Sequence, residues 1–374
     1  MADLHAEKIV QIEKIVMKFK RPRIIGHNAR IGTHGDRVTD PIVRIHTTNG
    51  LVGVGWSRLE KQQAEAIIGK PVGELFQLPD GVLPSGKILD MPLWDLAAKW
   101  HNQPLYQLLG ARGSREVELY DGSIYIDDLQ ASDQQTHDIF HEEVKTGINY
   151  GYKNFKIKIG RGGRWMPMAK GLDRDILVIH AVREAAGSEA KIMLDTNNGG
   201  TLNSSKETLA QCADVGIYWF EEPFAEDSAL CEALKNFIRE NNWNTLLADG
   251  ESWPPHSFFN WVERKFIDVV QHDLRAEGIS WWKKIAAQIE PWGARCAPHC
   301  WGSVLERYAH AHFAASIPHF ELLEAAPADV SGIVLNGWHM RDGKLIVPDT
   351  PGTGFDLEPD VIAQGVKAED GFRI

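Results

Sequence analysis

The pattern of hydrophobic and polar positions changes near residue 117 and divides the chain into two parts. Before it, residues 9–19 and 41–56 alternate apolar and polar side chains, which is typical of strands with one buried face. Asn49 and Gly50 lie between apolar flanks in the second of these segments. That dipeptide is a strong hairpin signal, so we expect two antiparallel strands there.

Two other segments complete the first part. Residues 91–110 carry an apolar stripe at helical spacing and predict a buried helix. Residues 19–40 are polar and contain several glycines, so they predict a loop of about twenty residues. Loops of that length in compact domains are often lids or binding loops. The helical stripe consists of Leu93, Leu96, Ala97 and Trp100.

After residue 117, short apolar runs alternate with longer amphipathic stretches. Strands that alternate with helices indicate parallel βα units, and eight such strands over about 200 residues fit a (β/α)8-type barrel. Residues 331–374 are expected to pack back on the N-terminal part. The predicted strands are 118–125, 154–160, 191–197, 217–223, 245–251, 268–274, 294–300 and 319–325.

The composition describes an acidic protein with a large core. The chain has 374 residues, is 43% hydrophobic and carries a net charge of −11. Without a long basic cluster, nucleic acid is not an expected partner. Since no apolar run approaches about 20 residues, we expect no membrane span and a cytoplasmic location.

Four cysteines in a chain of this length do not form a disulfide framework. Cys296 and Cys300 flank His299 in CAPHC, a spacing that could hold zinc. A structural zinc site usually needs four ligands, and the other two cysteines do not form a second short pair. We therefore favour buried free thiols over a zinc site.

The stretch NFKIKIG places Lys156 and Lys158 on one face of a predicted strand. Two ammonium groups on a buried strand repel each other and are costly to desolvate. Acidic groups opposite them would make this arrangement tolerable. A lysine beside another cation and away from water also has a lowered pKa, as a general base near neutral pH requires.

Carboxylates recur at the ends of successive predicted strands. Asp195, Glu221 and Glu251 each end one strand and are about one βα unit apart. In a barrel such side chains meet at the C-terminal mouth, where barrel active sites lie. Three converging carboxylates repel unless a cation binds them, and an all-oxygen ligand set favours Mg²⁺.

The next two strands end in a possible acid–imidazole pair. Asp273 and His299 are 26 residues apart and come from adjacent predicted strands. A carboxylate that accepts the Nδ1–H of the imidazole fixes its tautomer and makes Nε2 more basic. We therefore favour a catalytic role for this pair. The remaining histidines that we considered receive a structural interpretation: His272, His310, His312 and His319.

Taken in order, these motifs resemble the enolase superfamily, mandelate racemase subgroup. The matching pieces are KIK, LDTN, FEEP, DGE, the HD strand and the PH strand, together with the helix of residues 91–110. The resemblance implies a (β/α)7β modified TIM barrel with an N-terminal α+β capping domain that the C-terminal tail completes. We expect a capping part at 1–120, a barrel at 121–330 and a returning tail at 331–374.

The resemblance also implies residue roles. Asp195, Glu221 and Glu251 resemble the ligands of one Mg²⁺ per active site. Lys158 resembles the base on one face of the substrate with Lys156 as its neighbour, and His299 with Asp273 resembles the dyad on the other face. The 20–40 segment resembles the specificity loop of the family. The residues that we expect to bind substrate are Asn197, Glu324, Arg23 and His27, with Glu321 as an alternative to Glu324.

The chemistry implied is removal of a proton α to a carboxylate, through an enediolate. A polar, cationic loop suits a sugar acid, so we expect dehydration to a 2-keto-3-deoxy acid. Arg161 and Arg164 could contact the substrate or lie on the surface. The alternatives are a racemase, epimerase or cycloisomerase using the same proton abstraction, a Schiff-base aldolase, or a non-catalytic sugar-acid sensor. We also expect a homo-oligomer.

Overall fold

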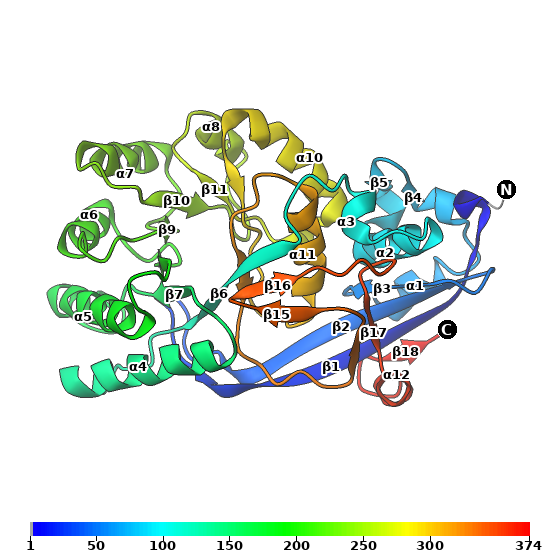
Figure 1. Ribbon diagram of the computed structural model, residues 1–374, viewed down its shortest axis with the longest axis horizontal. Coiled ribbons are helices and arrows are strands. Elements are labelled where there is room, and N and C mark those ends of the chain that lie inside the picture. Colours follow the sequence, from blue (N-terminus) through cyan, green and yellow to red (C-terminus); the bar gives the residue numbers. More distant parts are fainter. Residues whose placement is uncertain (1–2) are drawn as a thin grey trace.

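The computed structural model describes residues 3–374. Its N-terminal part is built on a long antiparallel hairpin of β1 (Ile9–Ile25) and β2 (Gly35–Thr47), which runs from the barrel to the far end of the molecule (Figure 1). β3 (Val52–Trp56) pairs with β2, so the hairpin predicted at Asn49-Gly50 is confirmed. A C-terminal strand, β18 (Phe372–Arg373), pairs with β1 and gives the sheet order β18-β1-β2-β3.

The prediction of a loop over residues 19–40 is wrong for most of its length. Strand pairing continues to Lys20 opposite Arg37 and resumes at Ile25 opposite Gly35, so the connecting loop covers only 26–34. Some of the polar side chains that suggested a loop have partners on the barrel. Arg23, for example, donates to Asp127 and Glu143 at 2.8 Å each. Ion pairs between two domains compensate the charges, so a strand with charged side chains can be covered by another domain.

The predicted helix of residues 91–110 is two helices that pack against β3. α2 (Asp90–Trp100) buries most of its length, and α3 (Leu105–Leu108) follows it. Gly53 and Gly55 in β3 allow α2 to approach closely, since a Cβ on Gly53 would lie 2.3 Å from the carbonyl oxygen of Pro92. The smaller elements of this part are α1 (Lys61–Glu65), β4 (Phe76–Gln77), β5 (Gly81–Val82) and three short 3₁₀ turns at Leu4–Ala6, Val72–Glu74 and Pro84–Leu89.

The barrel sheet follows the order predicted from the sequence. Each strand from β6 to β12 pairs in parallel with the next, and β13 pairs with β6. A bridge between Cys296 and Phe320 joins the remaining edge, so the sheet closes. The strands are β6 (Glu116–Ile124), β7 (Phe155–Lys158), β8 (Ile192–Asp195), β9 (Trp219–Glu221), β10 (Leu246–Asp249), β11 (Val269–Val270), β12 (Arg295–Cys296) and β13 (Leu323–Ala325).

Helices connect these strands and surround the barrel (Figure 1). Side-chain oxygens of Ser132, Thr201 and Asp227 cap the N-termini of three of them by accepting backbone hydrogen bonds. Within residues 3–374 the chain leaves β13 without an eighth barrel helix, so the (β/α)7β fold is confirmed. The helices are α4 (Asp133–Asn149), α5 (Met168–Ala186), α6 (Leu202–Gln211), α7 (Ser228–Glu240), α8 (Phe258–Glu263), α9 (Leu274–Glu277), α10 (Ile279–Ile289) and α11 (Glu306–Ser316), with a short 3₁₀ turn at Glu290–Trp292.

The C-terminal segment contacts both parts of the molecule. β16 (Lys344–Ile346) extends the barrel sheet by antiparallel pairing with β6, and β15 (His339–Arg341) pairs with β16. β14 (Ile333–Leu335) pairs with β17 (Phe355–Leu357). The chain then passes through α12 (Pro359–Gly365), which packs on β1, and ends in β18.

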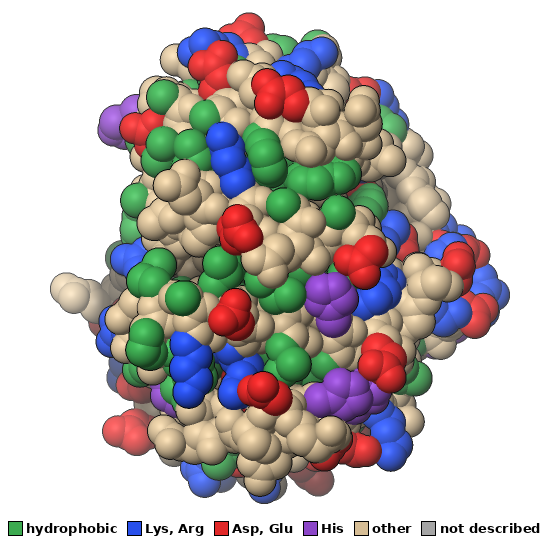
Figure 2. Space-filling model, turned by 90° about the vertical axis from the view of Figure 1, so that its left-hand side faces the viewer, with side chains coloured by type: hydrophobic (Ala, Val, Ile, Leu, Met, Phe, Trp, Pro, Cys, Tyr) green, Lys and Arg blue, Asp and Glu red, His purple; other side chains and the backbone are tan. Residues whose placement is uncertain are grey.

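The outer surface has no feature that changes these expectations. In Figure 2, which views the side formed by the barrel helices, lysine and arginine side chains are interspersed with aspartate and glutamate. Across residues 3–374, none of the helices combines the length and apolar character that a membrane span requires.

Arg161 lies inside the protein and joins three elements. Its guanidinium donates to Asp175 of α5 at 2.6 Å and to Asp128, after β6, at 2.9 Å. Asp175 also accepts the backbone N–H of Gly160 and of Arg161, and so fixes the end of β7. Arg164 is exposed and stacks on Trp165. The donors of Arg161 therefore serve the fold, and a substrate contact through this side chain is not supported.

We expect Arg161→Met to lower the free energy of unfolding by about 3–5 kcal/mol, because buried Asp175 loses its cationic partner and Asp128 keeps only Arg174. Chemical denaturation measures this difference. Arg164→Met is the matched control and should change the value by about 0.5 kcal/mol or less. A loss below about 1 kcal/mol in Arg161→Met would show that the ion pairs do not stabilise the end of β7.

His312 on α11 is a buried neutral imidazole that bridges two segments. Its Nδ1 accepts from the backbone N–H of Tyr106 at 3.2 Å, and its Nε2 donates to the carbonyl of Thr353 at 3.0 Å. Burial lowers its pKa to about 4. The unfolded chain therefore binds a proton below about pH 6.5 that the folded chain excludes until about pH 4.

This difference predicts that His312 makes the protein less stable in acid. Its contribution is complete above about pH 6.5 and falls by about 3 kcal/mol as the pH approaches 4. The difference in unfolding free energy between wild type and His312→Gln, measured from pH 8 to pH 4, should show this slope. His339→Gln, at an exposed position, is the control. Parallel pH profiles for wild type and His312→Gln would contradict the prediction.

Candidate active site

The barrel interior has a regular layer beneath its C-terminal mouth. This layer is a separate cluster of buried side chains, which consists of Tyr120, Met193, Trp219, Ala248, Val269, Ala297 and Leu322. Because side chains alternate along a strand, the residues two positions later point into the barrel at the mouth. These residues are Asp195, Glu221, Gln271, His299 and Glu324.

Both lysines of β7 lie among acids. Lys156 is fully buried, with its Nζ 2.6 Å from Glu221, 3.0 Å from Glu324 and 3.4 Å from Asp195. Lys158 donates a hydrogen bond to Asp195. Aromatic rings lie against both ammonium groups: Tyr120 is 5.4 Å from that of Lys156 and Tyr125 is 5.3 Å from that of Lys158.

The structure does not show the expected lowering of the Lys158 pKa. Burial and Lys156 lower this pKa, but Asp195 and Tyr125 outweigh them and raise it above its usual value. Burial also lowers the pKa of Lys156, but Glu221 and Glu324 outweigh burial and raise this pKa above its usual value. The physical reason is that each ammonium group donates a hydrogen bond to a carboxylate.

Asp195 and Glu221 come from adjacent strands in register. Burial raises the pKa of Asp195, but Lys158 and Lys156 outweigh it and hold this carboxyl in its charged form. Glu221 accepts hydrogen bonds from Lys156, Trp219 and Gln271, and its pKa is raised to about 8 by burial and by nearby Asp195, against the effect of Lys156.

Glu251 lies just beyond the end of β10, next to His299. Its Oε2 is buried, is 3.5 Å from His299 Nε2 and makes no hydrogen bond. Asn197 Oδ1 and Gln271 Oε1 are also buried without a hydrogen-bond donor. Acceptor oxygens without donors, next to several carboxylates, fit a hard divalent cation.

A second acidic group that the sequence did not single out lies next to these residues. Glu222, Glu226 and Asp249 place carboxylate oxygens within 4.8 Å of one another. Burial and the charge of Glu251 raise the pKa of Glu222 to about 10. The motifs EEP and DGE were the available signal, since each offers two acids. Strand parity separates Glu221 from Glu222, whereas Asp249 and Glu251 are two residues apart, so parity does not distinguish them.

His299 and Asp273 form a hydrogen-bonded pair. His299 Nδ1 is 2.8 Å from Asp273 Oδ1, and Asp273 also accepts the backbone N–H of Ser252 at 3.1 Å. Burial lowers the pKa of His299, but Glu251, Asp273 and Glu324 outweigh it and raise the value to about 10. The imidazole is therefore protonated at neutral pH in this arrangement.

Of the two glutamates in HFELLEA, Glu324 lies at the mouth. It is 3.0 Å from Lys156, 3.8 Å from His299 Nε2, and accepts the backbone N–H of Cys300. Glu321 instead pairs with Arg295 at 2.7 Å and accepts from Tyr218. Asn197 is buried beside Asp195, whose carboxylate accepts its backbone N–H at 2.7 Å.

The two residues predicted to reach the substrate from the N-terminal part have other contacts. Arg23 donates to Asp127, to Glu143 and to the carbonyl of Ser123, so its guanidinium is occupied. His27 is half-buried, with Nδ1 3.3 Å from the carbonyl oxygen of Ile126. The roles of Arg23 and His27 in substrate binding stay predictions.

The residues of the CAPHC motif have different neighbours. All four cysteines are free and buried. His299 uses Nδ1 for Asp273, whereas Cys300 lies near Glu306 and His310. His310 in turn contacts Glu306 at 2.8 Å. These contacts agree with buried thiols.

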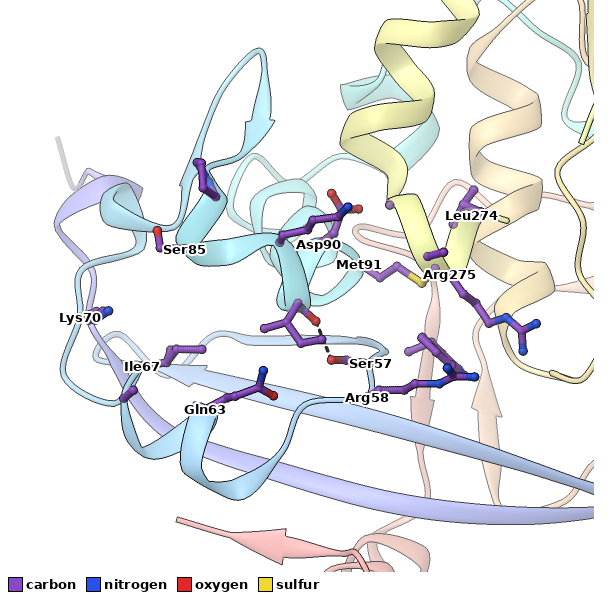
Figure 3. Close-up of a pocket in the computed structure, with 17 residues that line it drawn as sticks. Ser57, Arg58, Gln63, Ile67, Lys70, Ser85, Asp90, Met91, Leu274 and Arg275 are labelled. Carbon is purple, nitrogen blue, oxygen red and sulfur yellow. Dashed lines mark hydrogen bonds between the residues drawn. The ribbon is translucent and has the colours of Figure 1, made fainter. Parts of the chain in front are cut away.

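A large cavity lies beside the carboxylate cluster, not within it. About 510 Å³ in volume, it lies between the N-terminal part and α9, and its wall includes Arg58, Asp90, Met91 and Arg275 (Figure 3). The side chains of the two lysines of β7 and of His299 do not line it. The clustered charges, and not this cavity, therefore define the candidate active site.

Comparisons with known proteins agree with this geometry. Residues 140–361 match the family described as Enolase C-terminal domain-like. An arabinonate dehydratase from Saccharolobus solfataricus is 28% identical over 285 residues, which are 74% of this chain and 70% of that protein.

Two solved structures from Geobacillus are closely similar to the whole chain. One is a galacturonate dehydratase complexed with D-galacturonate and 5-keto-4-deoxy-D-galacturonate, with a TM-score of 0.93, 34% identity and 99% of each chain covered. The other is a mandelate racemase/muconate lactonizing protein complexed with magnesium and tartrate, with a TM-score of 0.94, 34% identity, and 99% of this chain and 97% of that one covered. The chain therefore belongs to the enolase superfamily, among its mandelate racemase-like members.

Proposed function

We propose that the protein is a Mg²⁺-dependent acid-sugar dehydratase that converts a sugar acid to a 2-keto-3-deoxy acid. The observation that carries the proposal is the order of groups around the barrel mouth. The carboxylates of β8, β9 and the end of β10 lie between two proton-transfer groups, Lys158 on β7 and His299 after β12. Proton-transfer groups on both sides of an anion site suit removal of one proton and delivery of another.

Asp195, Glu221 and Glu251 are the proposed Mg²⁺ ligands. Strand parity supports the first two, because both follow inward-facing residues of the interior layer. The donor-free Oε2 of Glu251 supports the third. When bound, Mg²⁺ would stabilise the second negative charge that develops on the substrate carboxylate as the α-proton leaves.

Lys158 is the proposed base. Its ammonium now donates to Asp195, so it becomes a base only when that carboxylate is engaged elsewhere and the lysine loses a proton. Lys156 is placed differently, since Glu221 and Glu324 hold it at 2.6 and 3.0 Å. It therefore orients these carboxylates and adds positive charge where the substrate carboxylate binds.

His299 is the proposed acid. With a pKa of about 10 it carries a proton on Nε2 at neutral pH, while Asp273 fixes Nδ1. In the dehydration, Lys158 takes the α-proton, the β C–O bond breaks, and His299 gives its proton to the departing hydroxyl, which leaves as water. The enol that remains tautomerises to the 2-keto-3-deoxy acid.

The decisive experiment is a panel of aldonic, aldaric and uronic acids with purified protein and Mg²⁺, assayed for 2-keto acid. Uptake of solvent deuterium at Cα without keto acid would indicate a racemase or epimerase instead. Activity that survives chelation of metal, together with borohydride trapping, would indicate a Schiff-base aldolase. Binding without any turnover would indicate a sensor.

A homo-oligomer and a cytoplasmic location also stay predictions.

Lys158→Ala should lower kcat by about 10³-fold or more, because the base on one face is lost. Calorimetric Mg²⁺ affinity should stay within about tenfold of wild type, because Lys158 is not a ligand. His299→Asn is the matched variant: if Lys158 alone abstracts the proton, His299→Asn retains solvent exchange at Cα while dehydration stops. Unchanged exchange in Lys158→Ala would reject Lys158 as the base.

Substitutions in the two clusters of carboxylates should affect Mg²⁺ binding differently, because one cluster holds the proposed ligands and the other, Glu222, Glu226 and Asp249, does not. Glu251→Gln should weaken Mg²⁺ binding by at least about tenfold, and Asp249→Asn should change it by less than about threefold. Titration calorimetry of both variants, with circular dichroism to check folding, measures this. If Asp249→Asn loses Mg²⁺ and Glu251→Gln keeps it, the ligands would be Glu222, Glu226 and Asp249.

A further inference from the structure

We propose that Arg21, on β1, binds a second carboxylate at the far end of the substrate, so that the preferred substrate is a dicarboxylic sugar acid. This inference rests on the proposed function and adds to it the charge of the substrate's distal end. Arg21 is only 5% exposed, yet the structure gives its guanidinium no ion pair or hydrogen bond with any residue from 3 to 374.

An unpaired buried guanidinium is unusual, and the neighbouring arginines differ from it. Arg23 pairs with Asp127 and Glu143, Arg161 with Asp128 and Asp175, and Arg275 with Glu306 at 3.1 Å. Burial lowers the pKa of Arg21, and nearby Asp121 and Asp40 act only at longer range. Buried charges are ordinarily paired, so this arginine lacks an anion.

The position of Arg21 is fixed by Trp301. The guanidinium carbon lies 4.2 Å from the centre of the indole ring, which is a cation–π contact. The backbone carbonyl of Trp301 accepts from Arg275 at 2.6 Å, and the indole stacks on Tyr125 at 4.8 Å. The guanidinium is therefore held in one place before a ligand binds, which reduces the entropic cost of binding.

The same contacts connect Arg21 to the reaction centre. Tyr125 stacks on Trp301 on one side and has the Lys158 ammonium 5.3 Å from its ring. His34 lies 4.7 Å from Tyr125, and burial lowers its pKa, with Lys158 and Arg21 both close enough to lower it further. Arg21 thus packs on Trp301, and Lys158 lies against Tyr125, the ring that stacks on Trp301.

These contacts identify the class of group that would bind. A guanidinium presents a planar fork of donors that matches a carboxylate in two parallel hydrogen bonds. The reacting carboxylate of the substrate must lie at the acidic cluster, so the group at Arg21 is the other end of the same molecule. A six-carbon aldaric acid has carboxylates at both ends, whereas the matched aldonic acid ends in a neutral hydroxymethyl group.

The test compares Arg21→Gln with wild type on galactarate and galactonate, an aldaric and aldonic pair. We expect Arg21→Gln to raise KM for the aldaric acid by about 30-fold or more, with kcat within about threefold and little change for the aldonic acid. Arg21→Lys, which keeps the charge without the fork, should be intermediate. Arg239→Gln, at an exposed position on α7, is the control and should match wild type. Equal losses on both acids would overturn the inference.

Binding measurements separate this inference from the proposed function. Calorimetry of the two acids with Mg²⁺-loaded Lys158→Ala, with and without Arg21→Gln, needs no turnover. Tighter binding of the aldaric acid that depends on Arg21 supports the inference even if no acid is dehydrated. Dehydration without any effect of Arg21→Gln leaves the proposed function in place and rejects the inference. Thermal unfolding of each variant confirms that it is folded.

Discussion

The structure depends on the mutual compensation of charges at the barrel mouth. Lys156 is fully buried, and an uncompensated ammonium in that position would be very costly. Asp195, Glu221 and Glu324 surround it within 3.4 Å, and equally those carboxylates could not lie so close together without the lysine. Each set of charges makes the other tolerable. The result is a rigid, polar centre inside an otherwise apolar barrel.

The barrel supports this centre through strand periodicity. The interior layer lies one step below the charged residues, so Met193 and Trp219 occupy the positions beneath Asp195 and Glu221. A shift of one residue in either strand would turn the carboxylates away from the mouth and bring apolar groups into it. Arg161 then fixes the end of β7 to α5, which holds the lysine strand in the register that this layer requires.

The N-terminal part completes the mouth by reaching across it. β1 extends over 17 residues and carries Arg21 to Trp301, while His34 at the start of the returning strand reaches Tyr125. The reacting end of a ligand would thus lie among barrel residues and its distal end would meet the other domain. If Arg21 binds the distal carboxylate, as we propose, reaction type and substrate choice depend on different parts of the chain.

The sequence by itself determined the features that hydrophobic periodicity and the order of strands and helices can encode. Alternating strands and helices predicted the barrel, and strand-end acids predicted that Asp195 and Glu221 would lie side by side, because parallel strands bring their carboxyl ends to one edge. Tertiary structure alone decided the rest. Arg21 and Arg23 are two residues apart with the same side chain, yet one is paired with Asp127 and Glu143 and the other is not. Likewise the lysines acquired raised, not lowered, pKa values, because distances between side chains on different strands are set by packing and not by local sequence.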